Sequence, residues 1–131
     1  MPDIDVLAVA VATVAAFVAS AVYYGVLGER LAQASPAAAQ AGGEMPPWKV
    51  AAELGRCLVL CAVFAGLAAE AGASSAGGGI LLGLALWVGF PLVLWTGAML
   101  HERTPLALAA IHGGDWLLKL VLIGAVVGAL Q

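Results

Sequence analysis

Residues 106–130 read LALAAIHGGDWLLKLVLIGAVVGAL, an apolar stretch of membrane-spanning length that contains an acid and a base, Asp115 and Lys119. On a helix, positions i and i+4 share one face, so this carboxylate and ammonium can pair with each other or with groups on a neighbouring helix. The flanking residues leave almost nothing polar to mark a side that faces water. We therefore predict an intramembrane ion pair, and ionisable groups inside a bilayer are the first candidates for function.

The composition of the whole chain is not that of an ordinary soluble domain. Of its 131 residues, 63% are hydrophobic and 10% are charged, whereas a soluble domain carries about a quarter charged residues. The net charge is −3 and basic runs are absent, so no nucleic-acid partner is predicted. Cys57 and Cys61 lie one helical turn apart in an apolar segment without further ligands at metal-binding spacing, and we interpret them as small core residues.

Four apolar runs are long enough to cross the hydrocarbon layer, which takes about 20 residues. They are residues 4–27, 48–71, 77–100 and 105–130. Two of the connections between them are short, which places the adjoining helices antiparallel in one bundle. The predicted fold is therefore all-α, a polytopic bundle of four transmembrane helices in a single membrane domain, residues 1–131.

The first run is predicted to be a retained transmembrane helix. It is about twice as long as the apolar region of an ordinary signal peptide, and the residues before it include Asp3 and Asp5 but no Lys or Arg. The connection that follows, residues 28–47, is the longest one. Its first half is predicted to form a short interfacial helix, which the Gly42-Gly43 and Pro46-Pro47 pairs break.

Basic residues near the predicted helix ends indicate the orientation of the chain. Arg30, Lys49 and Arg103 lie in the first and third connections, and Arg56 lies just inside the second helix. Because Lys and Arg gather on the cytoplasmic side, we predict that these connections are cytoplasmic and that both termini are not.

Small residues on three of the predicted helices allow close contacts between backbones. Gly79 and Gly83 have G-x-x-x-G spacing, as do Gly124 and Gly128. A further small-residue stripe on the first helix consists of Ala8, Ala12, Ala16 and Ser20. We favour packing inside the bundle over a specific dimer for these motifs. Pro91 lies in mid-helix and lacks a backbone donor, so it is predicted to kink the third helix.

The two halves of the chain share a pattern. Residues 23–30 (YYGVLGER) resemble residues 95–103 (WTGAMLHER), and Glu53 with Arg56 before Leu-Val-Leu resembles Asp115 with Lys119 before Leu-Val-Leu. This pattern favours two parallel two-helix repeats related by an axis along the membrane normal. The alternative is chance similarity between two aliphatic sequences.

The candidate site consists of the ionisable and hydroxyl-bearing side chains expected near the cytoplasmic ends of the helices. These are Glu53, Arg56, His112, Asp115, Lys119, Tyr23, Tyr24 and Thr96. Their positions allow them to converge on one polar pocket that binds a substrate or an ion. The alternative is that they pair with one another and fix the register of the helices. The chain lacks the motifs of hydrolases, metalloproteases and phosphate-binding loops, so no catalytic residue, cofactor or metal ligand is predicted.

Three groups of residues resemble a bacterial membrane family called domain of unknown function 1761. They are AAF at 15–17 before YYG at 23–25, GLALWVGF at 83–90, and IHGG at 111–114 before LIGA at 122–125. The resemblance covers nearly the whole chain and implies a small four-helix protein of the inner membrane, with no known activity. The family usually has Trp-Tyr in place of Tyr23-Tyr24, and Asn in place of His112.

The sequence favours a non-enzymatic membrane protein that works as a homo-oligomer or as a subunit of a membrane assembly. Small-residue helix faces and the absence of a soluble domain motivate this prediction. Membrane lipids and other membrane subunits are the expected partners, and the bacterial inner membrane is the expected location. The alternative function is a small transporter, or an ion or proton pathway through the charged pocket.

Overall fold

The computed structural model describes residues 4–41 and 45–131, and this part of the chain contains helices and no strands. The helices are α1 (Val6–Ala34), α2 (Pro36–Ala41), α3 (Pro47–Ala71), α4 (Ala76–Gly89), α5 (Pro91–His101) and α6 (Leu106–Leu130). Within the described ranges, four helices are long and apolar enough to cross a membrane: α1, α3, α6, and α4 with α5 as one broken helix. The predicted all-α membrane bundle is confirmed, and the chain is a multi-pass membrane protein.

The first helix is longer than its apolar run. It begins after Asp5, whose carboxylate accepts hydrogen bonds from the Leu7 and Ala8 amides at 2.9 and 3.2 Å. It continues past the expected end at residue 27 because the next residues include Glu, Arg, Leu, Ala and Gln, all good helix formers. It ends at Ala34 because Pro36 disfavours a helical conformation at the preceding Ser35. The short helix α2 follows at once, and Gly42-Gly43 lies outside the described residues.

The third membrane span is interrupted where the sequence predicts a kink. The helix α4 ends at Gly89, and α5 begins at Pro91. Phe90, between them, has φ −120° and ψ −74°, which is not helical. Proline has no N–H to continue the hydrogen-bond ladder, and its ring clashes with the carbonyl four residues earlier. This accounts for the break, and the predicted kink is confirmed.

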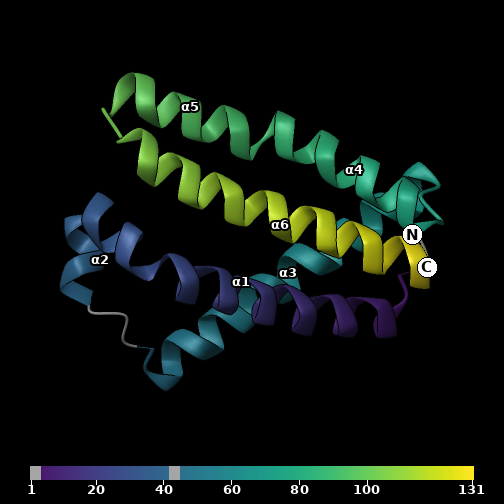
Figure 1. Ribbon diagram of the computed structural model, residues 1–131. Helices are drawn as coiled ribbons and strands as arrows, with labels where there is room; N and C mark the ends of the chain where they lie inside the picture. The colour runs from purple at the N-terminus through teal and green to yellow at the C-terminus, as the bar shows by residue number, and fades with distance from the viewer. Residues whose placement is uncertain (1–3, 42–44) are drawn as a thin grey trace.

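The helix α6 lies between α1 on one side and α4 with α5 on the other, and α3 packs mainly against α1 (Figure 1). Glycine allows the closest of these contacts. A Cβ added at Gly79 or Gly124 would collide with the backbone of the opposite helix, and so would one at Gly83 or Gly128. Both G-x-x-x-G motifs are therefore used inside the bundle, as predicted, and bring two backbones into contact.

The core lies where α1, α3 and α6 meet. Ala12 and Ala16 of the small-residue stripe on α1 are completely buried there, beside Cys61 and Phe64 of α3. Cys57 and Cys61 are both buried and unpaired, which agrees with their interpretation as core residues. Alanine and cysteine let α1 and α3 approach each other, while Phe64 fills the remaining space.

Both termini lie at the same end of the bundle, as an even number of spans requires (Figure 1). The side-chain amide of Gln131 donates to the carbonyl of Ala65 at 3.0 Å and accepts from the backbone N–H of Asp5 at 3.4 Å. Gln131 thus links the start of α1 and the end of α6 to the last third of α3.

The two halves share the order of helices but not their packing. In the second half, α4 and α6 are in backbone contact through glycine, whereas α1 and α3 pack through alanine, cysteine and phenylalanine side chains. The two acid–base pairs also differ, because Asp115 and Lys119 are buried while Arg56 is exposed. Corresponding residues of the two halves therefore lie in different environments, despite the similarity of their sequences.

Candidate functional site: a buried ion pair in the bundle

The centre of the site is the ion pair between Asp115 and Lys119, one turn apart on α6. The Lys119 Nζ lies 2.9 Å from Asp115 Oδ2, and the side chains are only 6% and 3% exposed, respectively. Their i, i+4 spacing places both groups on the same face of the helix. Both side chains are almost fully buried in the bundle, so the predicted intramembrane pair is present.

A serine from the neighbouring helix completes the coordination of the carboxylate. The hydroxyl of Ser20, on α1, donates a hydrogen bond of 2.6 Å to Asp115 Oδ1. Each carboxylate oxygen therefore has a donor, one from Lys119 and one from Ser20. The ammonium of Lys119 also lies 5.0 Å from the centre of the Trp116 ring, within range of a cation–π interaction. Buried charges are tolerated when they are paired and hydrogen-bonded in this way.

Two tyrosines that follow Ser20 on α1 form a second layer of contacts with α6. The hydroxyl of Tyr23 donates to the carbonyl of Ile111 at 2.6 Å. Gly114 makes this contact possible, because a Cβ at that position would collide with the Tyr23 hydroxyl. The hydroxyl of Tyr24 lies 2.7 Å from Nδ1 of His112 and shares a hydrogen bond with it. Hydroxyl groups of α1 thus bind α6 at three successive places.

Two tryptophans of the broken helix contact the same segment of α6 from its other side. The indole N–H of Trp87, on α4, donates to the carbonyl of Gly113 at 2.8 Å. The ring of Trp95, on α5, stacks on His112 with centroids 5.1 Å apart and an interplanar angle of 16°. Among the described residues, the buried indole nitrogen of Trp95 has no hydrogen-bond partner. His112 is therefore held between Tyr24 and Trp95.

The eight residues predicted to share one polar pocket do not all meet, which corrects that expectation. Asp115, Lys119, His112, Tyr23 and Tyr24 lie on the facing sides of α1 and α6. Glu53 and Arg56 instead form an ion pair of their own on α3, with the Arg56 side chain 62% exposed.

Thr96 is likewise outside this cluster of contacts. Its hydroxyl donates to the carbonyl of Val93 in its own helix at 3.0 Å. A threonine hydroxyl satisfied by the preceding turn needs no partner on another helix. Among the hydrogen bonds of the described residues, Thr96 therefore makes none to the other members of the candidate set.

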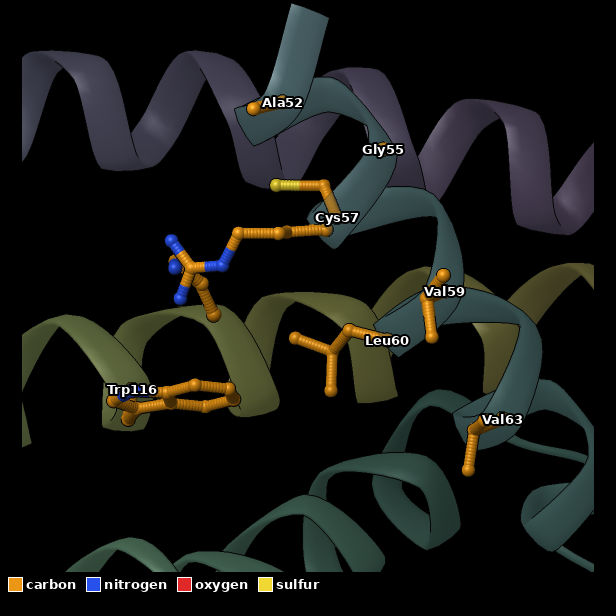
Figure 2. A pocket seen from close by; sticks show the side chains of 9 residues that line it. Ala52, Gly55, Cys57, Val59, Leu60, Val63 and Trp116 are labelled. Carbon is orange, nitrogen blue, oxygen red and sulfur yellow. The ribbon is translucent and has the colours of Figure 1, made fainter. Parts of the chain in front are cut away.

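A groove separates α3 from α6 beside the ion pair, with a volume of about 670 Å³. Arg56 and Lys119 both line it, so one member of each ion pair contributes to this groove. Figure 2 shows Leu60 of α3 and Trp116 of α6 facing the space between the two helices. In residues 4–41 and 45–131, no three His, Cys, Asp or Glu side chains gather closely enough to hold a metal ion.

A sequence comparison identifies the family of this chain. Residues 7–128 match the family described as "Protein of unknown function (DUF1761)". The chain belongs to the DUF1761 family. No curated protein and no solved structure matches it significantly. The resemblance seen in the sequence motifs is thus confirmed over nearly the whole chain, and membership of DUF1761 brings no activity with it.

In this DUF1761 protein, four residues of the site were not among the predicted ones: Ser20, Trp87, Trp95 and Trp116. Ser20 carries a recognisable signal, because it is the one hydroxyl in a stripe otherwise made of alanine. The tryptophans carry none, because an indole in a transmembrane helix is equally compatible with an interfacial position. Only the packing of α4 and α5 on α6 reveals which indole meets a backbone carbonyl.

Proposed function

We propose that the protein is a non-enzymatic integral membrane protein that acts as a homo-oligomer or as a subunit of a larger membrane assembly. The observation that supports this most strongly is the direct contact between Asp115 and Lys119, with Ser20 on the remaining carboxylate oxygen. Groups that are almost fully buried and already bound to each other are poorly placed to hold a transported substrate. Their role in this proposal is to fix α1 and α6 in register.

The packing of the bundle favours interactions at its outer surface. Along Gly79 and Gly83, the backbone of α4 contacts that of α6 without room for a path between them. The glycine faces of α4 and α6 are thus occupied within one chain, so contacts with other subunits would use other faces. The spans with the smallest buried share are α3 and the broken helix α4–α5, so their outer faces are the candidate surfaces for other subunits and for lipid.

The mass of the protein in lipid nanodiscs tests this proposal. We expect a defined multiple of the 13.1 kDa chain, or a stable complex with another membrane protein when the chain is extracted from its native membrane. A single chain without partners under both conditions would contradict the proposal. A complete chemical reaction catalysed by the purified protein would contradict its non-enzymatic part.

The second candidate function is a small transporter or an ion or proton pathway. The groove between α3 and α6 favours it, because the groove extends from the exposed Arg56 to the buried Lys119. Flux into proteoliposomes distinguishes the two functions. Transport requires flux above that of empty liposomes and its loss in Lys119→Met, whereas flux equal to that of empty liposomes counts against transport.

We also propose a location in the inner membrane of a bacterium, with both termini outside the cytoplasm. The support comes from Arg30, near the end of α1, and Arg103, in the connection between α5 and α6. In Figure 1, the end of α1 and this connection lie at the end of the bundle opposite the termini. An excess of Lys and Arg marks the cytoplasmic side of membrane proteins.

A further inference from the structure

The groove between α3 and α6 has two chemically different ends. Its lining contains the cations Arg56 and Lys119, with Trp116 beside them. The rest of the lining is small or aliphatic: Ala52, Gly55, Cys57, Val59, Leu60 and Val63. Figure 2 shows Val59 and Val63 projecting from α3 farther along the helix than Cys57. The volume of about 670 Å³ lies within the range of about 300–1,000 Å³ typical of ligand sites.

The charged lining of the groove is cationic. Arg56 and Lys119 contribute to it, whereas their partners Glu53 and Asp115 do not. The guanidinium has five N–H donors, and the only hydrogen bond it makes to the described residues goes from one nitrogen to Glu53. The exposed guanidinium is therefore free to donate to a further acceptor. An anion in the groove would supply this acceptor, and a guanidinium binds phosphate with two parallel hydrogen bonds.

The position of the groove along the membrane normal suits an amphiphile. Trp48 and Lys49 at the start of α3 are the kind of residues that mark a membrane interface. Arg56 follows Lys49 by about two turns, or about 10 Å along the helix, so its long side chain can reach a headgroup near the interface. Val59 and Val63 are exposed and lie still deeper. On the side of α3, the groove is therefore cationic toward the interface, at Arg56, and apolar toward the middle of the bilayer, while Lys119 reaches it from half-way along α6.

We propose that this groove binds one anionic phospholipid, with its phosphate on Arg56 and Lys119 and an acyl chain along Val59, Leu60 and Val63. Basic pockets between transmembrane helices are suited to anionic headgroups for electrostatic reasons. Lys119 keeps its contact with Asp115, and the lipid binds the side of the ammonium that faces the groove. The site belongs to the single chain and does not depend on the number of subunits in the assembly.

Native mass spectrometry of the full-length protein tests the proposal. The protein is reconstituted with equal amounts of phosphatidylglycerol and phosphatidylethanolamine, extracted in a mild detergent, and its bound lipids are counted. We expect the wild-type protein to retain phosphatidylglycerol in preference to phosphatidylethanolamine. Arg56→Gln removes a charge-assisted contact, so the retention of phosphatidylglycerol by this variant should fall about tenfold. Arg103→Gln is the matched control, because Arg103 is an exposed cation in the connection between α5 and α6, and it should behave as wild type.

A second variant keeps the test decisive if Arg56→Gln does not fold. Val63→Trp fills the apolar end of the groove from an exposed position and leaves every charge in place. It should lower phosphatidylglycerol retention in the same way. Equal retention of the two lipids by wild type, or unchanged phosphatidylglycerol retention in either groove variant, would overturn the proposal.

The same spectra separate this proposal from the proposed function. A single chain that retains phosphatidylglycerol supports the lipid site while contradicting assembly. An oligomer that retains no phosphatidylglycerol supports assembly and overturns the lipid site.

Discussion

Removal of one member of the Asp115–Lys119 pair is predicted to destabilise the protein far more than removal of both. The variants are Lys119→Met, Asp115→Leu and the double variant. In Lys119→Met, the carboxylate of a side chain that is 3% exposed keeps only the Ser20 hydroxyl as a donor. In Asp115→Leu, the ammonium keeps only the ring of Trp116. An uncompensated buried charge costs about 3–5 kcal/mol, which lowers the melting temperature by on the order of 10 °C.

The double variant removes both charges and keeps apolar volume at both positions. Replacement of a buried ion pair by apolar residues of similar size is often close to neutral. Ser20 loses its acceptor, but its hydroxyl can bond to the preceding turn of α1, as Thr13 already does to the Val9 carbonyl at 2.7 Å. The net loss should therefore remain below about 2 kcal/mol.

Thermal unfolding of the four proteins in detergent gives the interaction energy of the pair. We expect the loss of unfolding free energy in the double variant to be smaller than the sum of the two single losses by at least about 3 kcal/mol. The matched control is Glu53→Leu with Arg56→Met on α3, an exposed pair whose coupling should be at most about 1 kcal/mol. Additive single effects at positions 115 and 119, without rescue in the double variant, would refute the direct pair and favour separate roles along a pathway.

Three further predictions concern packing and orientation. Gly124→Ala places a Cβ against the backbone of α4 and should destabilise by about 1–3 kcal/mol, whereas Gly97→Ala, with open space around it, should be neutral or stabilising in the same thermal assay. Gly114→Ala should destabilise the wild type but have a much smaller effect in a Tyr23→Phe background, because the collision is with the tyrosine hydroxyl; equal losses of stability in the two backgrounds would contradict this. A reporter fused after Gln131 should give the signal of a non-cytoplasmic end, and cytoplasmic activity would reverse the orientation.

Patterns that depend on one helix at a time were predictable from the sequence. The four apolar runs, the break at Pro91 and the i, i+4 pair of Asp115 and Lys119 are all local, and the structure has them. The use of Gly79 and Gly124 inside the bundle followed from the preference of membrane helices for small residues at close contacts.

Features that depend on how the helices are rotated against one another were not predictable in this way. Glu53 and Arg56 have the same charges as Asp115 and Lys119, yet α3 is rotated so that Arg56 remains exposed. The contact of Ser20 with Asp115 requires the relative height of α1 and α6, which no pattern in either segment encodes. The longer end of α1 was missed because hydropathy marks the membrane span, whereas helix propensity decides where the helix stops.

The direct contact between the Lys119 and Asp115 side chains can be tested by measuring the distance between them in a lipid bilayer. Solid-state NMR can measure the dipolar coupling between the labelled side-chain nitrogen of Lys119 and the labelled carboxyl carbon of Asp115. We predict a strong coupling, as required by the 2.9 Å contact of the Nζ with Oδ2, and a much weaker one between Arg103 and Asp115 as a control. A Lys119–Asp115 coupling too weak for direct contact would show that the two groups are separated, and would contradict the ion pair.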